Sequence, residues 1–183
     1  KRKLLIEERS LIVNKELEKV APALETALQS LSLVTKKELD DIRVLNNPPE
    51  LIRMTLTAVC FITEGKELEW KEIQGIMKKN DFLSKIHDMK GGRVSNDVRA
   101  KVGKKYVESD KWVIAKISNS YKSAGLLAQW LTSQLEFGVV QAKVEPLQKE
   151  IVSLKDELIS LETRKVELEA GVRQTEDLIE EYK

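Results

Sequence analysis

Histidine and cysteine, the residues that most often carry nucleophilic or metal chemistry, each occur once in the 183-residue sequence, as His87 and Cys60. One of each cannot build a zinc cluster or a disulfide framework. Cys60 lies in an apolar stretch and has no basic residue within four positions, which indicates an inert buried thiol. For His87 we expect a packing or surface role.

Two Gly-Lys pairs, Gly65-Lys66 and Gly103-Lys104, are the nearest approach to a phosphate-binding loop. Both lack the earlier glycine and the following hydroxyl residue of the G-x-x-x-x-G-K-[ST] pattern, so neither can hold nucleotide phosphates in that way. We therefore expect no nucleotide site, no catalytic centre and no metal or cofactor in this chain.

The distribution of charged side chains is the remaining feature that could serve binding. The 31 Lys and Arg residues nearly balance the 30 Asp and Glu residues, but residues 78–105 hold nine basic side chains against three acidic ones. A local excess of this kind attracts an acidic partner through long-range electrostatics. It does not by itself say whether that partner is a nucleic acid or an acidic protein surface.

Apolar residues alternate at spacings of three and four at both ends of the chain. They are Ile6, Val13, Leu17, Val20, Leu24, Ala27, Leu31 and Val34 in the first segment, and Val144, Leu147, Ile151, Leu154, Leu158, Leu161, Leu168, Val172 and Ile179 in the second. A repeat of 3.5 residues over several heptads predicts coiled-coil helices. We expect two such arms, residues 1–34 and 138–183, on either side of a domain formed by residues 35–137.

The two arms are expected to pair with each other as an antiparallel hairpin, because they belong to one chain and the domain lies between them. Parallel pairing of each arm with a second chain is the alternative. Pro22 and Pro146 are each expected to bend their helix, at a cost of about 3 kcal/mol. Leu4, Leu11 and Leu28 lie beside the first seam, where they either cover the flank of the partner helix or provide a second register for sliding.

The middle domain is expected to contain about six short helices, because turn and capping residues divide it at short intervals. The expected helices cover residues 36–45, 49–62, 70–79 and 82–89, with a fifth after Ser95 and a long last one from residue 111. Gly91-Gly92 should end the fourth. No stretch alternates with period two, so the sequence predicts an all-α protein, a small helical bundle at the tip of an intramolecular antiparallel coiled coil.

Several short motifs occur in a characteristic order. Asn47-Pro48-Pro49 follows the charged helix of residues 36–45, Trp70-Lys71 comes next, and Ala124 to Trp130 and Val144-Glu145-Pro146-Leu147 complete the series. In order and spacing they resemble the microtubule-binding domain at the tip of the dynein stalk. Only about six residues precede Trp70 after Thr63, which makes the sequence more similar to a cytoplasmic dynein than to axonemal members with an extra flap.

The resemblance implies that the helical bundle docks on tubulin through its first short helix, the basic helix ends that follow and its last helix. The matching residues in this sequence are Lys36, Lys37, Arg43, Lys79, Lys116 and Lys122. Cytoplasmic relatives tend to place an acidic and a basic residue one turn apart in the last helix. This sequence has Ala115 and Asn119 there, which leaves Lys116 or Lys122 to make that contact.

The resemblance also implies a partner, a location and a mechanism. The partner would be a microtubule of α/β-tubulin in the cytoplasmic cytoskeleton, with no nucleic acid or membrane involved. The distant ATPase ring and the dimerising regions would lie outside this chain, which would itself not be an enzyme. Sliding of the first arm along the second would move the helix carrying Lys36 and Arg43, and so couple filament affinity to the ring.

Two alternatives remain at this stage. A nucleic-acid-binding helical module would lay the basic stretch of residues 78–105 along phosphates and would show a steep salt dependence. A purely structural coiled-coil hinge would dimerise instead. No run of 18 apolar residues is present that could span a bilayer.

Overall fold

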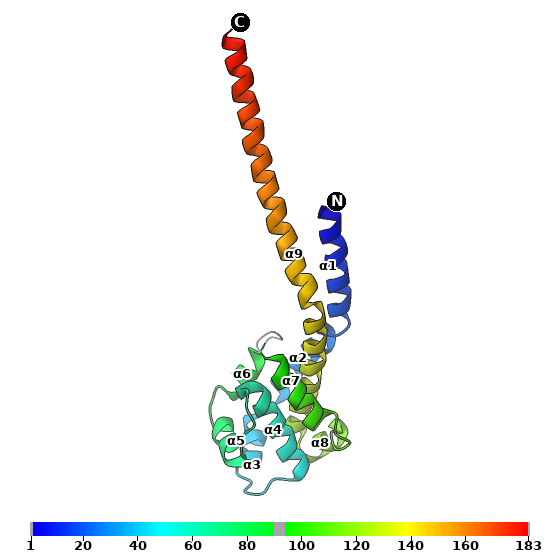
Figure 1. Ribbon diagram of the computed structural model, residues 1–183. Helices are drawn as coiled ribbons and strands as arrows, with labels where there is room; N and C mark the ends of the chain where they lie inside the picture. The colour runs from blue at the N-terminus through cyan, green and yellow to red at the C-terminus, as the bar shows by residue number, and fades with distance from the viewer. Residues whose placement is uncertain (1, 90–93, 183) are drawn as a thin grey trace. The chain divides into compact units, whose positions relative to one another are not determined.

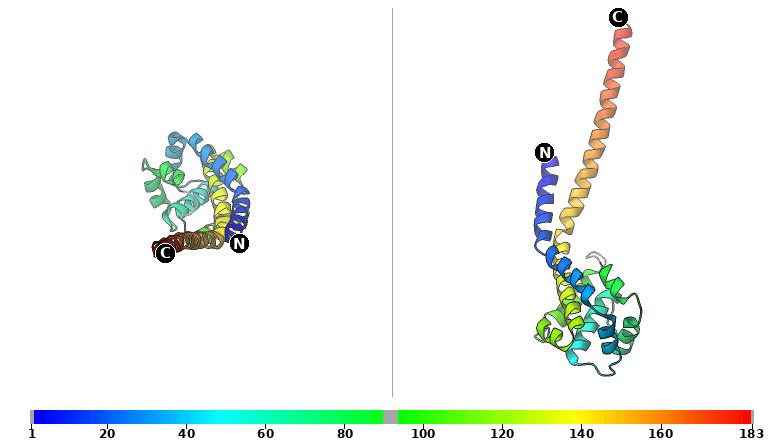
Figure 2. Two further views of the ribbon diagram at one scale, coloured as in Figure 1. Left: turned by 90° about the horizontal axis from the view of Figure 1, so that it is seen from above. Right: turned by 180° about the vertical axis from the view of Figure 1, so that it is seen from behind.

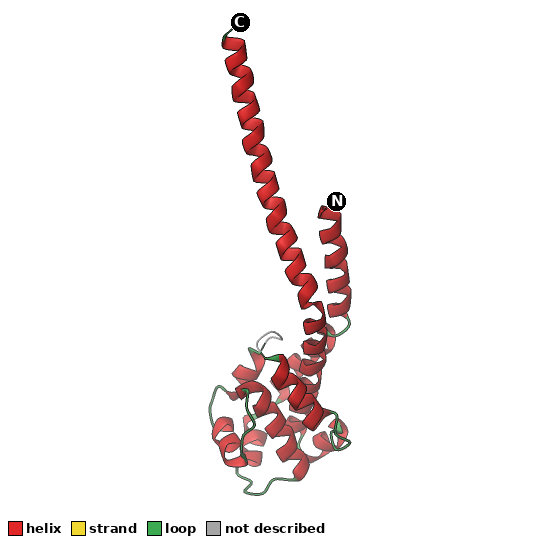
Figure 3. Ribbon diagram, in the orientation of Figure 1, coloured by secondary structure: helices red, strands yellow, loops and turns green. Residues whose placement is uncertain are grey.

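The computed structural model describes residues 2–89 and 94–182, and within these segments it contains helices and no strand (Figure 1 and Figure 3). The predicted all-α class is therefore confirmed. The predicted helix end at Gly91-Gly92 lies outside the described residues, as do Lys90 and Arg93 of the basic stretch. The chain divides into two compact units, one formed by Lys1–Lys15 with Val144–Lys183 and the other by Glu16–Lys143.

The first unit is an antiparallel pair formed by helix α1 (Arg2–Glu18) and helix α9 (Lys122–Glu181). Ion pairs join Arg2 to Glu157 at 3.2 Å and Arg9 to Glu150 at 3.1 Å. The later residue of α1 pairs with the earlier residue of α9, so the two helices run in opposite directions (Figure 2). The predicted pairing of the two arms within one chain is confirmed.

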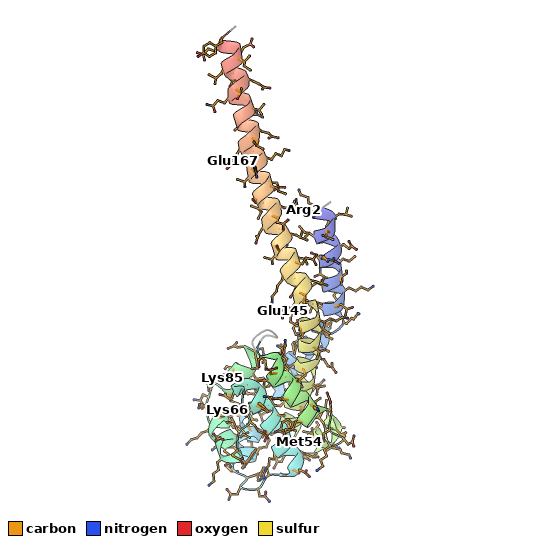
Figure 4. All side chains as sticks on the ribbon, in the orientation of Figure 1. Arg2, Met54, Lys66, Lys85, Glu145 and Glu167 are labelled. Atoms are coloured by element: carbon orange, nitrogen blue, oxygen red, sulfur yellow. The ribbon has the colours of Figure 1, made fainter. Side chains whose placement is uncertain are left out.

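Apolar side chains of the first unit differ sharply in burial. Val13, Val144 and Ile151 are buried between the helices, as the heptad pattern predicts. Leu4 and Leu11 are 70% and 69% exposed, so they do not cover the flank of the partner helix. On α9, every described residue after residue 160 is exposed. Figure 4 shows Glu167 in this part of α9, beyond the end of α1 that Arg2 marks.

The first segment is not one continuous helix. Helix α1 ends at Glu18, helix α2 (Ala21–Ser30) follows, and a short 3₁₀ turn, η1 (Leu31–Leu33), completes it. Pro22 lies in the first turn of α2, where the N–H that proline lacks would have no partner within the helix. Pro22 therefore starts a new helix instead of bending a continuous one. Pro146 by contrast lies inside α9, which continues through it.

Short helices around a central apolar one form the second unit. They are α2, η1, α3 (Lys36–Arg43), α4 (Glu50–Glu64), α5 (Trp70–Met77), α6 (Phe82–His87), α7 (Asn96–Val102), the π-helical turn η2 (Gly103–Val107) and α8 (Ile114–Ser120), followed by the first part of α9. Helix α4 is the centre of the core, since Ile52, Leu56 and Val59 on it are completely buried. It ends at Gly65, whose φ of 76° is readily adopted only by glycine.

The expected long last helix from residue 111 is wrong in one respect. The structure has two helices there, because Tyr121 is extended (φ −147°, ψ 121°) and separates α8 from α9. Helix α8 folds back on α9 so closely that a Cβ at Gly125 would lie 2.5 Å from the Cβ of Ser118. Gly138 does not interrupt α9, which runs on to Glu181. None of the described helices is long and apolar enough to cross a membrane.

Candidate functional site

Helix α3 is short, amphipathic and capped at its start by Thr35. The Thr35 hydroxyl oxygen accepts a hydrogen bond from the Glu38 main-chain N–H at 3.2 Å, which satisfies one of the free donors of the first turn. Leu39 and Ile42 face the core and are buried. Lys36 and Lys37 are consequently held on the exposed side of the first turn.

The other end of α3 is fixed by helix α5, which lies beside it (Figure 1). The Gln74 amide donates to the carbonyl of Arg43 at 2.6 Å and to that of Leu45 at 3.2 Å. The Trp70 indole N–H donates to the Leu45 carbonyl at 2.8 Å. These bonds satisfy the last carbonyl of α3 and that of Leu45 just beyond it, so α5 holds the chain where it turns toward Pro48.

Two contacts bring the start of α3 close to other predicted site residues. The Lys36 ammonium donates to the Asn80 side chain at 3.3 Å, next to Lys79 in the segment after α5. The Glu38 carboxylate accepts from the Ser123 main-chain N–H at 3.0 Å, next to Lys122 at the start of α9. The structure thus gathers Lys36, Lys37, Lys79 and Lys122 around one helix end.

Arg43 and Lys116 are placed differently. Arg43 lies at the far end of α3, about 10 Å along the helix from Lys36, and its guanidinium pairs with Asp40 at 3.2 Å. Its charge is therefore partly neutralised. Lys116 is exposed on α8, together with Ala115 and Asn119. No hydrogen bond or ion pair between described residues joins the Lys116 side chain to α3.

The gathered lysines also differ in charge pairing from several others in this unit. Lys85 lies 3.8 Å from a Glu64 oxygen, Lys105 contacts Glu67, and Lys111 contacts Glu50. Among the described residues no carboxylate lies within ion-pair distance of Lys36, Lys37, Lys79, Lys116 or Lys122. Among the described residues Lys101 and Lys104 likewise have no carboxylate within ion-pair distance, so the lack of an acidic partner does not by itself distinguish the lysines around α3.

The residues that could carry other chemistry are held inert. Cys60 is completely buried in α4, and burial together with the nearby charge of Glu64 raises the pKa of its thiol to about 12. His87 is exposed at the end of α6. Among the residues that the structure describes, no group of His, Cys, Asp and Glu is arranged to hold a metal ion.

Sequence reasoning missed Asn80, Glu38 and Ser123, the residues that connect α3 to its neighbours. The spacing of Thr35 and Glu38 is typical of a capping box, which predicts that the Glu38 side chain accepts a hydrogen bond from the main-chain N–H of Thr35. The contact with Ser123 spans 85 positions of the chain, and no local pattern indicates it.

Comparison with known proteins finds dynein heavy chains among the relatives of this chain. No family model matches the chain. It is 36% identical over 148 residues to the cytoplasmic dynein heavy chain of Paramecium tetraurelia, with 80% of this chain and 3% of that protein covered. It is 32% identical over 151 residues to dynein heavy chain-like protein 1 of Plasmodium falciparum, covering 81% of this chain and 3% of that protein.

A longer alignment joins it to the cytoplasmic dynein heavy chain of Drosophila melanogaster, at 27% identity over 96% of this chain and 4% of that protein. Its homologues are thus dynein heavy chains, and the chain corresponds to a short segment of that family. The solved structure titled "Microtubule Binding Domain of DYNEIN-C" shares its fold, with a TM-score of 0.61, 18% identity, and coverage of 73% of this chain and 94% of that one. The predicted resemblance is confirmed, and the chain spans only 3 to 4% of the length of these relatives.

Proposed function

We propose that this chain binds microtubules as the stalk tip of a dynein motor, through the exposed face made by the start of α3, the segment after α5 and the start of α9. The observation that carries the proposal is the group of lysines around the first turn of α3 that have no acidic partner in the described part of the chain. An acidic protein surface such as tubulin attracts such a group, and salt screens the attraction, so that binding stays reversible.

The six residues proposed to contact the filament are Lys36, Lys37, Arg43, Lys79, Lys116 and Lys122. Lys36 and Lys37 are proposed as the principal contacts because they are exposed and no carboxylate among the described residues lies within ion-pair distance of them. Arg43 is proposed as a weaker contact, since its guanidinium already pairs with Asp40. The proposal assigns no catalysis to this segment and places it in the cytoplasm on the cytoskeleton. The relatives give no support to a nucleic-acid module or to a purely structural hinge.

Affinity is proposed to respond to the register of the antiparallel arms. Leu4 and Leu11 form an exposed stripe on α1, so a shifted register would still place apolar side chains at the seam. Helix α1 leads through α2 into α3, so axial movement of the first arm would be carried along the chain to Lys36. Engineered cysteine pairs that fix different α1–α9 registers are expected to give strong and weak binders. Equal affinity in all registers would exclude this coupling.

Microtubule cosedimentation tests the binding face directly. The double variant Lys36→Glu, Lys37→Glu should lose binding about tenfold or more, since it reverses two charges in the proposed contact. The matched control is Lys101→Glu, Lys104→Glu, which makes the same charge change on α7 and η2, outside the face, and should bind within about twofold of wild type. Equal losses in the two variants would show a general charge effect and refute this site.

A further inference from the structure

Helix α9 begins without a capping residue of its own. Tyr121 precedes its first residue and has no short side-chain acceptor that could reach back to the first N–H groups. Those N–H groups have no partner within the helix, and the positive end of the helix dipole favours a carboxylate there. The start of α9 therefore needs an acceptor from elsewhere in the chain.

Glu38 of α3 supplies that acceptor. Its Oε2 accepts from the Ser123 main-chain N–H at 3.0 Å and also from the Ser123 hydroxyl. Ser123 is the second residue of α9 and is completely buried. One carboxylate oxygen thus satisfies two donors at the N-terminus of another helix.

The Glu38 side chain does not make the local contact that is usual at this position of a helix. In a capping box the acidic residue at the third helical position bonds back to the backbone of its own cap. Helix α5 shows that closed form, where the Glu72 carboxylate accepts from the Glu69 main-chain N–H at 2.9 Å. In α3 the main-chain half is present, since Glu38 N–H donates to Thr35, but the carboxylate crosses to Ser123. Glu38 therefore connects the N-termini of α3 and α9.

We propose that Glu38 is a positioning residue that sets the orientation of the first turn of α3, with Lys36 and Lys37, against the start of α9. Gln74 and Trp70 already hold the C-terminal end of α3, so the Glu38 contact fixes the N-terminal end, which carries the two lysines. Binding groups held in place before binding lose less conformational freedom on binding. The affinity consequence rests on the proposed microtubule function, whereas the structural role of the contact does not.

If Glu38 acted only through its negative charge, its removal would have the opposite effect on microtubule binding. Glu38 adds a negative charge to a surface proposed to meet an acidic partner, so removing that charge would strengthen binding. Positioning instead requires the acceptor oxygen. Glutamine keeps that oxygen and loses the charge, while alanine loses both, which separates the two roles.

The test compares Glu38→Ala, Glu38→Gln and Asp41→Ala by microtubule cosedimentation. Asp41 is exposed on the same helix, so its variant is the matched charge control. Glu38→Ala should bind about fivefold more weakly, a ratio that corresponds to about 1 kcal/mol. Glu38→Gln should stay within about twofold of wild type, and Asp41→Ala should bind equally or more tightly. Tighter or unchanged binding by Glu38→Ala would overturn the proposal.

Amide hydrogen exchange gives a readout that needs no filament. The Ser123 amide should exchange faster in Glu38→Ala and at the wild-type rate in Glu38→Gln; unchanged exchange in Glu38→Ala would overturn the proposal. If Glu38→Ala does not fold, Ser123→Ala serves instead, because it deletes the hydroxyl donor in a small buried site. It should speed exchange in the first turn of α3, and unaltered exchange would again overturn the role.

These measurements separate the two proposals. If the wild-type chain does not sediment with microtubules, or if Lys36→Glu, Lys37→Glu binds as well as wild type, the binding function fails. The exchange of the Ser123 amide still decides whether Glu38 holds the two helix ends together.

Discussion

Lys36 and Lys37 lie in the first turn of α3, where the positive end of the helix dipole disfavours basic side chains. Helix stability does not account for two lysines at this position. The binding of an acidic partner proposed above would account for them, because the same dipole adds to the positive potential that the lysines present. Residues that break a local rule in this way are expected at functional surfaces.

Acidic substitutions at this helix end should therefore change the free energy of unfolding and the microtubule affinity in opposite directions. Lys36→Glu, Lys37→Glu is expected to raise the free energy of unfolding by about 0.5–1 kcal/mol, because acidic side chains suit the first turn, while microtubule binding falls. Urea unfolding followed by circular dichroism measures the first effect. Lys104→Glu in η2, the turn that continues α7 and ends this helical segment, is the counterpart and should lower stability, since a basic residue is favoured there. A destabilised Lys36→Glu, Lys37→Glu variant would contradict this explanation.

At the scale of elements, the contact between α8 and α9 depends on the absence of a side chain at Gly125. A Cβ there would lie 2.5 Å from the Cβ of Ser118 and 2.7 Å from its Cα, a backbone atom that cannot move independently. Gly75 in α5 has open space around its Cβ direction. The two glycines thus occupy helices for different reasons.

Alanine substitution at these two glycines should have opposite effects on folding. Gly125→Ala is expected to lower the free energy of unfolding by about 1–3 kcal/mol through overpacking. Gly75→Ala should raise it by about 0.5–1 kcal/mol, because alanine is the better helix former and meets no clash. Urea denaturation of both variants provides the comparison. Equal effects would show that the close approach of α8 to α9 is absent in solution.

The whole molecule combines a packed bundle with a long helix of very uneven burial. Within the first unit, Val144 and Ile151 of α9 are buried against α1, whereas Leu168 and Val172 are 63% and 56% exposed. An isolated helix in water is marginally stable, and packing of an apolar face supplies most of the stability of protein helices. The two parts of α9 should therefore differ in local stability although they form one continuous helix.

Hydrogen exchange is expected to show this difference along α9. Amides of residues 165–180 should exchange about tenfold or more faster than those of residues 146–155, because opening costs less where no partner helix packs. Mass spectrometry of peptic fragments resolves the two segments. Equal protection at low protein concentration would contradict the exposed state of the later residues. Protection that rises with concentration would indicate that the apolar stripe pairs between chains.

Much of this arrangement follows from local sequence. The heptad spacing of residues such as Val13 and Ile151 predicts both arms, since a 3.5-residue apolar repeat requires a partner helix. Gly65 marks the end of α4 because its backbone conformation excludes most other residues. Thr35 marks the start of α3 because its hydroxyl can accept from the first turn. Lys36 and Lys37 are selected because the resemblance to the dynein stalk tip implies that this first short helix faces the filament, and their role there stays a prediction.

Other features depend on residues far apart in the sequence. The hydrogen bond from the Gln74 amide to the Arg43 carbonyl and the ion pair between Lys105 and Glu67 join residues that are 31 and 38 positions apart in the chain. Charge counts in residues 78–105 could not show which lysines are neutralised by such pairs.

The sequence by itself therefore determined the helical class and the two heptad-patterned arms, because each follows from the spacing of residues along single helices, whereas the lysines at the start of α3 are selected by the resemblance to the dynein stalk tip. Only the tertiary structure decided which lysines gather on one face and how Glu38 of α3 caps α9. Those outcomes depend on atoms that folding brings together from 85 positions apart, and periodicity in the chain carries no information about such contacts.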